Sequence, residues 1–256
     1  MPLRRPLLTA CALLLLVAGP LAAAETEHFQ RTIPLAPGGT LKLHNFSGRV
    51  TITGTDRGEV TISATRTASR DLLDRIKLDV TVSGTTVEIE ANKKVASSSS
   101  WFNWHKSDVV DTEMEIQVPR HTNLKIDVFS SPVVVTNVEG THRAHGFSSD
   151  IRMTGVNGPI KADTFSGRID VELAAAAIGP NLTLETFSGD IDVRVPQAAR
   201  ATVAFNSFSG DLTCDSPMTF TSKSRHSLHG DLSGGASDAS ITLKTFSGDA
   251  RILKPR

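Results

Sequence analysis

The sequence predicts an all-β protein, a parallel β-solenoid (β-helix) of repeats about 20 residues long with an N-terminal β-sheet cap. A motif typified by Phe-Ser-Gly-Asp at 187–190 recurs through the second half of the chain. From Phe129 onward, successive copies are separated by 18, 18, 22, 21, 20 and 18 residues, a spacing typical of stacked repeats. Apolar and polar residues alternate around the copies, as in strands with one buried face.

The first 24 residues are expected to be a cleaved export signal. Arg4 and Arg5 precede an apolar run over 7–21, and alanines at 22–24 provide a small-residue cleavage site. An uncleaved anchor is the alternative, but a Gly-Pro pair interrupts the run, which is shorter than the roughly 20 residues needed to cross a membrane. We therefore expect an exported protein, periplasmic or on the cell surface, with no membrane span after cleavage.

Charge and cysteine content exclude several classes of protein. Without Arg4 and Arg5, the 27 Lys and Arg fall to 25, against 27 Asp and Glu. This near balance gives no electrostatic case for nucleic acid or an anionic membrane. Cleavage leaves Cys214 alone, so no internal disulfide can form. Cys11 precedes most of the apolar run, which disfavours a lipoprotein anchor.

Residues 25–120 are expected to form the N-terminal β cap. Ser69 is placed to cap a short helix over 69–75. Gly84 lies in the turn of a predicted hairpin between 76–82 and 86–90. Other strands are predicted where apolar and polar residues alternate, over 41–44, 50–53, 60–63 and 112–118.

Residues 121–256 are expected to form the solenoid, each repeat holding two short strands and a corner. In the best copy, Leu182 and Leu184 point inward before the corner, and Ile191 and Val193 point inward after it. Stacking successive copies would place each strand about 4.8 Å from the same strand of the next copy. A single coil buries too little surface to be stable, whereas a stack buries a continuous core.

The phenylalanine that opens each repeat is expected to form a ladder of stacked, buried rings, each pair adding about 0.5–1.5 kcal/mol. Seven of the 11 phenylalanines occupy this position. The glycine two residues later supplies a corner suited to positive φ. Where the motif degenerates, at 129 and 228, we expect an end coil or an irregular rung. The ladder residues are Phe129, Phe147, Phe165, Phe187, Phe208 and Phe246, with Phe46 as an outlying copy.

The repeats also resemble a known family. The segments 39–43 and 46–54, with the later Ser-Gly-Asp repeats, are similar to the bacterial DUF4097 family of candidate adhesins, over nearly all of the mature chain. The resemblance implies a β-solenoid-like repeat protein of the bacterial envelope, without established enzymatic activity. It carries no binding residues over to this chain.

Two patterns suggest chemistry but favour structural roles. A catalytic triad needs one Ser placed against one His and one acid, whereas the corner serine recurs in almost every copy. His142 with His145, and His226 with His229, have an i, i+3 spacing that points to opposite faces of a strand, and no acid or Cys completes a ligand set. We expect surface histidines, and no catalytic, cofactor or metal site.

The residue after each corner is expected to form an outward column in which four aspartates follow one another: Asp190, Asp211, Asp231 and Asp249. Like charges at this spacing repel, so water, a corner N–H or a cation must offset them. A solvated aspartate that caps its own turn is favoured. A Ca²⁺ ladder is the alternative, although the glycine-rich nonapeptides of Ca²⁺-binding β-rolls are absent.

Trp101, Phe102 and Trp104 are the candidate partner contacts. They follow four serines in a segment that breaks the strand pattern. Exposed aromatic residues of this kind mark contact surfaces. The alternatives are that the segment covers an open end of the solenoid, or that it touches a membrane.

The predicted function is non-enzymatic: an exported envelope protein, either an adhesin-like or a scaffold module, that binds an unidentified envelope protein or glycan. An accessory domain in envelope signalling is one alternative. A polysaccharide-active β-helix enzyme is less favoured, because such enzymes hold clustered acids and bases in long loops beside a groove. The corners here are short.

Overall fold

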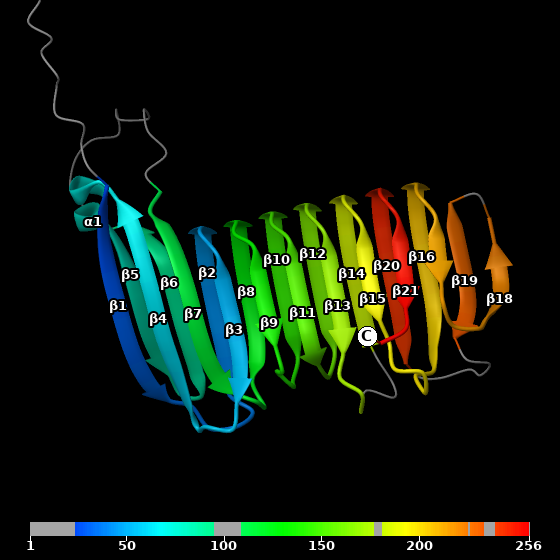
Figure 1. The fold of residues 1–256 in the computed structure, drawn as a ribbon, viewed down its shortest axis with the longest axis horizontal. Coiled ribbons are helices and arrows are strands. Elements are labelled where there is room, and N and C mark those ends of the chain that lie inside the picture. Colours follow the sequence, from blue (N-terminus) through cyan, green and yellow to red (C-terminus); the bar gives the residue numbers. More distant parts are fainter. Residues whose placement is uncertain (1–23, 95–108, 177–180, 225, 233–238, 256) are drawn as a thin grey trace, which may run out of the picture.

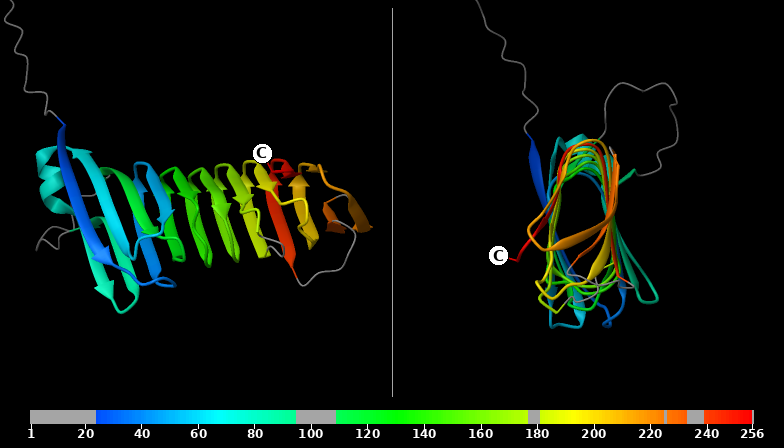
Figure 2. Two further views of the ribbon diagram at one scale, coloured as in Figure 1. Left: turned by 60° about the horizontal axis from the view of Figure 1, so that its bottom comes forward. Right: turned by 90° about the vertical axis from the view of Figure 1, so that its right-hand side faces the viewer.

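The computed structural model describes residues 24–94, 109–176, 181–224, 226–232 and 239–255. These residues form an elongated all-β solenoid, as the repeats predicted (Figure 1). A ten-stranded sheet, called sheet A, and an 11-stranded sheet, called sheet B, enclose one continuous apolar core. Viewed from its end, the solenoid has a flattened oval cross-section (Figure 2).

The strand order differs from the chain order in both sheets. Sheet A consists of β1 (Glu25–Pro34), β4 (Glu59–Ala68), β7 (Asp111–Pro119), β3 (Val50–Thr55), β9 (Val133–Thr136), β11 (Ile151–Val156), β13 (Ile169–Leu173), β15 (Ile191–Arg194), β21 (Ala250–Leu253) and β17 (Leu212–Cys214). Sheet B consists of β18 (Met218–Lys223), β19 (Ser227–Leu232), β16 (Ala201–Ser209), β20 (Ser240–Ser247), β14 (Asn181–Ser188), β12 (Ile160–Ser166), β10 (His142–Ser148), β8 (Asn123–Ser130), β2 (Thr40–Ser47), β6 (Thr86–Lys94) and β5 (Ile76–Ser83).

One coil is a strand of sheet B, a corner and the following strand of sheet A. Neighbouring coils pair in parallel and in register, so that Ser188 lies between Ser166 and Ser247. Residues at equivalent positions therefore form columns along the stack. This register decides which side chains meet on the outer faces.

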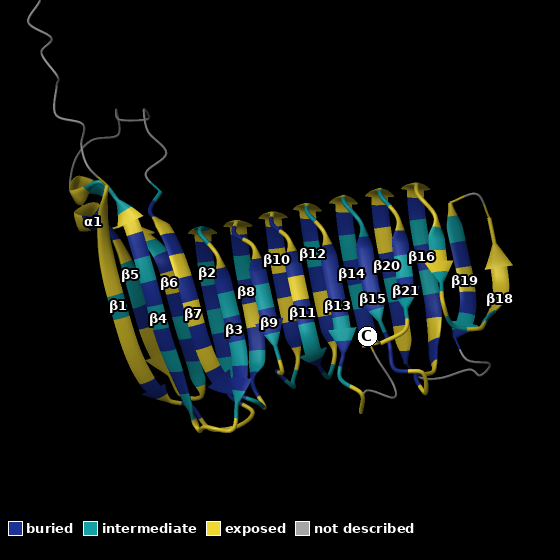
Figure 3. Cartoon of the chain, in the orientation of Figure 1, coloured by how far each residue is buried: buried dark blue, intermediate teal, exposed yellow. Residues whose placement is uncertain are grey.

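The core follows from the period-two alternation. Buried residues alternate with more exposed ones along many of the strands (Figure 3). Leu182 and Leu184 before the corner, and Ile191 and Val193 after it, are at most 1% exposed. Burying an aliphatic side chain of this size contributes about 1.5–3 kcal/mol. Because each coil adds only a few such residues, stability accumulates along the stack.

The prediction that successive copies are neighbours is wrong at the C-terminal end. The last coil, β20 with β21, lies between the coil of β14 with β15 and the coil of β16 with β17. The copy at Leu228 forms β19, which pairs antiparallel with β16. The expected irregular rung at 228 is thus confirmed, and Asp231 leaves the aspartate column.

The N-terminal end shows the same kind of insertion. The coil of β2 with β3 lies between β6 with β7 on one side and β8 with β9 on the other. Phe129 is consequently internal, and the prediction of an end coil or irregular rung there is wrong. Antiparallel strands β4 and β1 extend sheet A beyond β7, and β5 extends sheet B beyond β6. Each sheet contains strands from both sides of residue 120, the expected boundary between cap and solenoid.

The helix and the hairpin expected in the cap are both present. Helix α1 (Arg70–Arg75) starts after Ser69, but the Ser69 side chain makes no capping hydrogen bond, contrary to expectation. The Ser69 carbonyl oxygen instead accepts from the Leu73 N–H at 3.1 Å. The hairpin around Gly84 is confirmed as β5–β6, with φ of +57° at the glycine.

Two expected segments lie outside the described residues: 1–23 of the export signal, and Trp101, Phe102 and Trp104. In the part of the chain that the structure describes, no helix has the length and apolar character to cross a membrane.

His142 is fully buried, so the expectation of a surface histidine is wrong at this position. It occupies the inward column between Leu124 of β8 and Ile160 of β12. Its Nε2 lies 3.2 Å from the Val138 carbonyl oxygen, and burial lowers the pKa of the imidazole below its ordinary 6.5. His145 points to the opposite face, as the spacing predicted, and pairs with a carboxylate there.

Acid is expected to destabilise the protein through His142. A lowered folded-state pKa means that the unfolded chain binds more protons, so this contribution to stability is complete above about pH 6.5 and is lost as pH falls below it. His142→Leu should reduce the loss in urea midpoint between pH 7.5 and 5.5. An identical loss in the variant and the wild type would contradict this role.

Candidate functional site

The motif phenylalanines form one continuous row along the solenoid. Ring centroids of neighbours are 4.5–5.1 Å apart, with interplanar angles of 2–13°. His226 stacks on the last ring, Phe208, at 5.6 Å. Six steps of about 4.8 Å give the row a length of roughly 29 Å. In spatial order the rings are Phe46, Phe129, Phe147, Phe165, Phe187, Phe246 and Phe208.

The expectation that these rings are buried is wrong. Their exposed fractions are 39–65%, with Phe46 the most covered and Phe208 the least. The preceding residue takes the inward position; Thr164 and Thr186 are 4–5% exposed. The following phenylalanine therefore points outward. Stacking covers the faces of the rings and leaves their edges exposed, which makes a narrow apolar strip on the surface.

Under the strip, buried hydroxyl groups satisfy the corner backbone. The Thr164 hydroxyl donates to the Ser149 carbonyl, and the Thr186 hydroxyl donates to the Gly167 carbonyl, both at 3.2 Å. In the described part of the chain, no motif serine is hydrogen-bonded to a histidine. Ser47 donates instead to Asp111 at 2.7 Å. The corner hydroxyls thus support structure.

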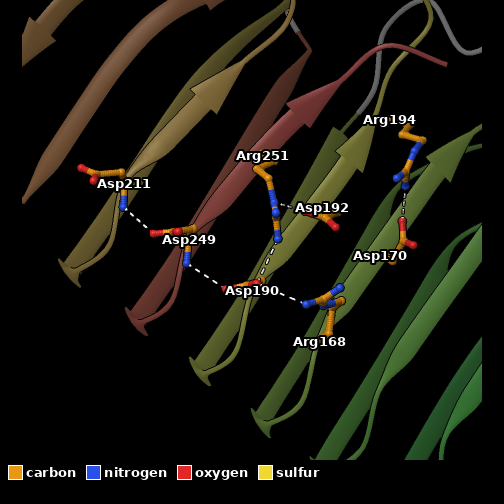
Figure 4. A network of polar contacts seen from close by, with 8 residues as sticks. All are labelled: Arg168, Asp170, Asp190, Asp192, Arg194, Asp211, Asp249 and Arg251. Carbon is orange, nitrogen blue, oxygen red and sulfur yellow. Dashed lines mark hydrogen bonds and ion pairs between the residues drawn. The ribbon is translucent and has the colours of Figure 1, made fainter. Parts of the chain in front are cut away.

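The aspartate column lies at the start of the sheet A strands (Figure 4). Asp190 accepts the backbone N–H of Asp249 at 3.1 Å, and Asp249 accepts that of Asp211 at 3.0 Å. Arg168 and Arg251 also donate to Asp190, at 3.3 and 2.9 Å. Backbone N–H groups of the adjacent coil and two guanidinium groups thus offset the carboxylate charges. Among the described residues, no cluster of three or more His, Cys, Asp or Glu side chains could hold a metal ion.

A second row on sheet A is also paired. Asp170 and Asp192 are only 7–8% exposed, because arginine side chains cover them. Arg194 donates to Asp170 at 2.6 Å, and Arg251 to Asp192 at 2.7 Å. Arg152 adds a contact to Asp170 at 3.5 Å. Each arginine of this network faces a carboxylate, so this part of the face neutralises its own charge.

The outer face of sheet B presents a polar row beside the aromatic strip. The row lies two residues before six of the seven phenylalanines and contains both acids and bases. His44 is 3.6 Å from Asp127, His145 pairs with Asp163, and Lys244 Nζ is 2.9 Å from Glu185 Oε1. The row consists of His44, Asp127, His145, Asp163, Glu185 and Lys244.

Two grooves lie between the aromatic strip and this polar row. One, of about 400 Å³, is lined by Phe46, Phe129 and Phe147 together with His44 and Asp127. The other, of about 470 Å³, lies farther along the same face. It is lined by Phe165, Phe187, Phe246, Asp163, Glu185 and Lys244, among others. Apolar edges therefore face paired polar groups along much of sheet B, an arrangement suited to binding an elongated ligand.

A further row, four residues before each phenylalanine, is basic over four successive strands. Lys42, Lys125, Arg143 and Lys161 are neighbours in the register of β2, β8, β10 and β12. A cavity of about 370 Å³ lies among the last three. The sequence-based predictions missed this row. Counting back four residues from the motifs at 46, 129, 147 and 165 would have found it.

The solved structures to which this chain is similar are distant in sequence. A candidate cell adhesion protein from Clostridium sporogenes is 14% identical, with a TM-score of 0.48, over 89% of this chain and 100% of that chain. A candidate lipid-binding protein from Parabacteroides distasonis (12% identity, TM-score 0.27) and a candidate adhesin from Bacteroides fragilis (13%, 0.31) each cover 89% of this chain and 97% of their own. At these values the likenesses transfer no ligand or activity. No curated protein matches the sequence.

A family model described as Toastrack DUF4097 matches residues 141–253. The matched region runs from β10 to β21 and holds five of the seven stacked phenylalanines. Two further coils of the same kind, β8 with β9 and β2 with β3, lie N-terminal to the matched region. The family model that matches residues 141–253 is thus the one that the repeats had indicated.

Proposed function

We propose that this protein is a non-enzymatic, exported, adhesin-like module that binds an envelope protein or glycan on the outer face of sheet B. The observation that carries the proposal is the unbroken row of seven phenyl rings, 39–65% exposed, along this face. Contiguous exposed apolar surface on a soluble domain marks an interaction site.

The chemistry beside the strip favours binding over catalysis. The acids and bases of the polar row are paired with one another across neighbouring strands, as in His145 with Asp163 and Lys244 with Glu185. They offer hydrogen bonds to a ligand while the ring edges offer apolar contact. Trp101, Phe102 and Trp104 remain proposed contacts with a partner, in addition to this face.

The proposal is tested by removing one ring from the middle of the strip. Phe165→Thr abolishes two stacking contacts, which should cost about 1–3 kcal/mol of stability. It should lower retention on immobilised cell-wall polysaccharide or envelope protein of the producing bacterium at least tenfold, about 1.4 kcal/mol of binding free energy.

The matched control is Phe220→Thr on β18, where the ring is 57% exposed but lies outside the strip. This variant should bind like the wild type. Far-UV circular dichroism would first establish that both variants are folded. Wild-type retention by a folded Phe165→Thr protein would refute the proposed face.

A further inference from the structure

The basic row on sheet B is a stack of like charges, and only Lys42, at its end, has a carboxylate residue opposite it in the register, Glu88 of β6. Lys42, Lys125, Arg143 and Lys161 are neighbours across four in-register parallel strands, at a strand spacing of about 4.8 Å. None of the four makes an ion pair or side-chain hydrogen bond with the described residues. Lys125, Arg143 and Lys161 are exposed.

On sheet A, by contrast, four arginines form ion pairs with aspartates. Arg152, Arg168, Arg194 and Arg251 each contact an aspartate at 2.6–3.5 Å. Like charges directly opposite on neighbouring strands are destabilising. Sheet B nevertheless carries four cations in succession. The formal net charge of the whole chain is zero, so this positive charge is local to one face. A ligand that supplies negative charge would offset it.

We infer that this row binds a linear anionic polysaccharide, such as a polyuronate, lying along the solenoid axis. The inference rests on the proposed function and names the ligand class of the same face. An extended pyranoside chain repeats at a length close to the strand spacing, so carboxylates on one side of the chain recur at multiples of the spacing between the cations. The cavity of about 370 Å³ among Lys125, Arg143 and Lys161 falls within the size range of ligand pockets.

The neighbouring rows favour a glycan over other polyanions. Asp127 and Asp163 line the same cavity and are acceptors when ionised. The hydroxyl groups of a sugar ring can donate hydrogen bonds to these carboxylates, whereas phosphodiester groups carry only acceptor oxygens. On the other side of the basic row lie the neutral Asn123, Thr141 and Pro159. The polymer's carboxylates therefore contact the basic row and its hydroxyls contact the aspartates.

The test compares two variants with equal loss of charge. Lys125→Gln, Arg143→Gln and Lys161→Gln together remove the centre of the row. Arg57→Gln, Arg200→Gln and Lys223→Gln together remove three exposed cations elsewhere. Binding to polygalacturonate is measured by isothermal titration calorimetry and affinity electrophoresis at several salt concentrations. Neutral dextran, a single-stranded polynucleotide and anionic phospholipid vesicles are parallel probes.

The expected result is salt-sensitive binding of the wild type to polygalacturonate, since charge contacts weaken with ionic strength. The row variant should lose at least about tenfold in affinity, and the control variant should lose less than about twofold. Dextran should not bind.

Equal affinity of the two variants would overturn the inference, as would absence of wild-type binding to polygalacturonate. Polynucleotide or vesicle binding as tight as polygalacturonate binding, and lost in the same row variant, would overturn the assignment to a glycan. If Phe165→Thr abolishes retention on envelope material while the row variant retains it fully, the anionic ligand is refuted and the proposed face stands.

Discussion

Replacing Gly189 by alanine is expected to lower the stability of the protein by about 3–5 kcal/mol. The φ angle at Gly189 is +151°, a region that L-residues rarely adopt. A Cβ atom there would lie 2.1 Å from the Gly167 carbonyl oxygen of the adjacent coil. That oxygen belongs to backbone held in register on both sides, so it cannot move aside cheaply. Chemical denaturation followed by circular dichroism measures the effect.

Gly58→Ala is the matched control for this substitution. A Cβ atom at Gly58 would meet no atom within 4 Å, and its φ is not in the positive region. Its denaturation midpoint should stay close to that of the wild type. If Gly189→Ala lowered the denaturation midpoint no more than Gly58→Ala does, the close contact between the corners of adjacent coils would be contradicted.

Replacing Leu243 by alanine is expected to cost about 2–5 kcal/mol, as much as Leu184→Ala. Leu243 lies on β20, the last sheet B strand in the chain, yet it is fully buried between β14 and β16. A coil that ended the stack would lose less, because its core residues would have neighbours on one side only. Comparing Leu243→Ala with Leu184→Ala therefore tests whether the coil of β20 and β21 lies inside the stack or at its end.

Leu228→Ala on β19, nearer the end of the stack, supplies the comparison for Leu243. Leu228 is 9% exposed, against 0% for Leu243 and Leu184. We expect a smaller loss of stability there, measured by the same denaturation assay. A Leu243→Ala protein no less stable than Leu228→Ala would contradict insertion of the last coil.

The order of the coils could not be predicted because the coils are interchangeable by sequence. Thr-Phe-Ser-Gly-Asp at 245–249 repeats the residues at 186–190. Each coil has similar inward-facing side chains and similar backbone hydrogen-bonding groups at its strand edges. The local sequence therefore does not specify which coil lies next to which. The period predicted the solenoid correctly. The insertion depends on how the chain connects coils that are not adjacent in space.

The alternation of inward and outward residues along the strands predicts that the phenylalanines of the aromatic strip are exposed. The sequence-based prediction instead followed the hydrophobicity of phenylalanine. Leu182, Leu184 and Thr186 continue one inward phase, which places Phe187 outward. Hydrophobicity suggested a buried ring instead. His142 shows the opposite error: it was expected on the surface because its side chain is polar. Its neighbours in the inward column are Leu124 and Ile160, and this position predicts that His142 is buried. At both positions the phase of the strand decided the outcome.

The candidate site emerges only when equivalent positions are aligned across coils. Lys125 and Lys161 are ordinary surface lysines in a linear sequence. The parallel register brings them to either side of Arg143, and the ion pairs of sheet A show by contrast that their lack of partners is unusual. Charge balance over the whole chain concealed this local asymmetry.

The most direct test of the binding face is to mask each face separately. In a Cys214→Ser background of residues 25–256, Thr183→Cys places a thiol on the outer face of sheet B, and Thr154→Cys places one on the outer face of sheet A. Both threonines are half-buried on interior strands, so the two sites are comparable. Each protein is coupled to maleimide-polyethylene glycol, and its retention on envelope polysaccharide and protein is measured. We predict that the polymer at position 183 abolishes retention while the polymer at 154 leaves it intact; loss of retention only on masking position 154 would contradict the account.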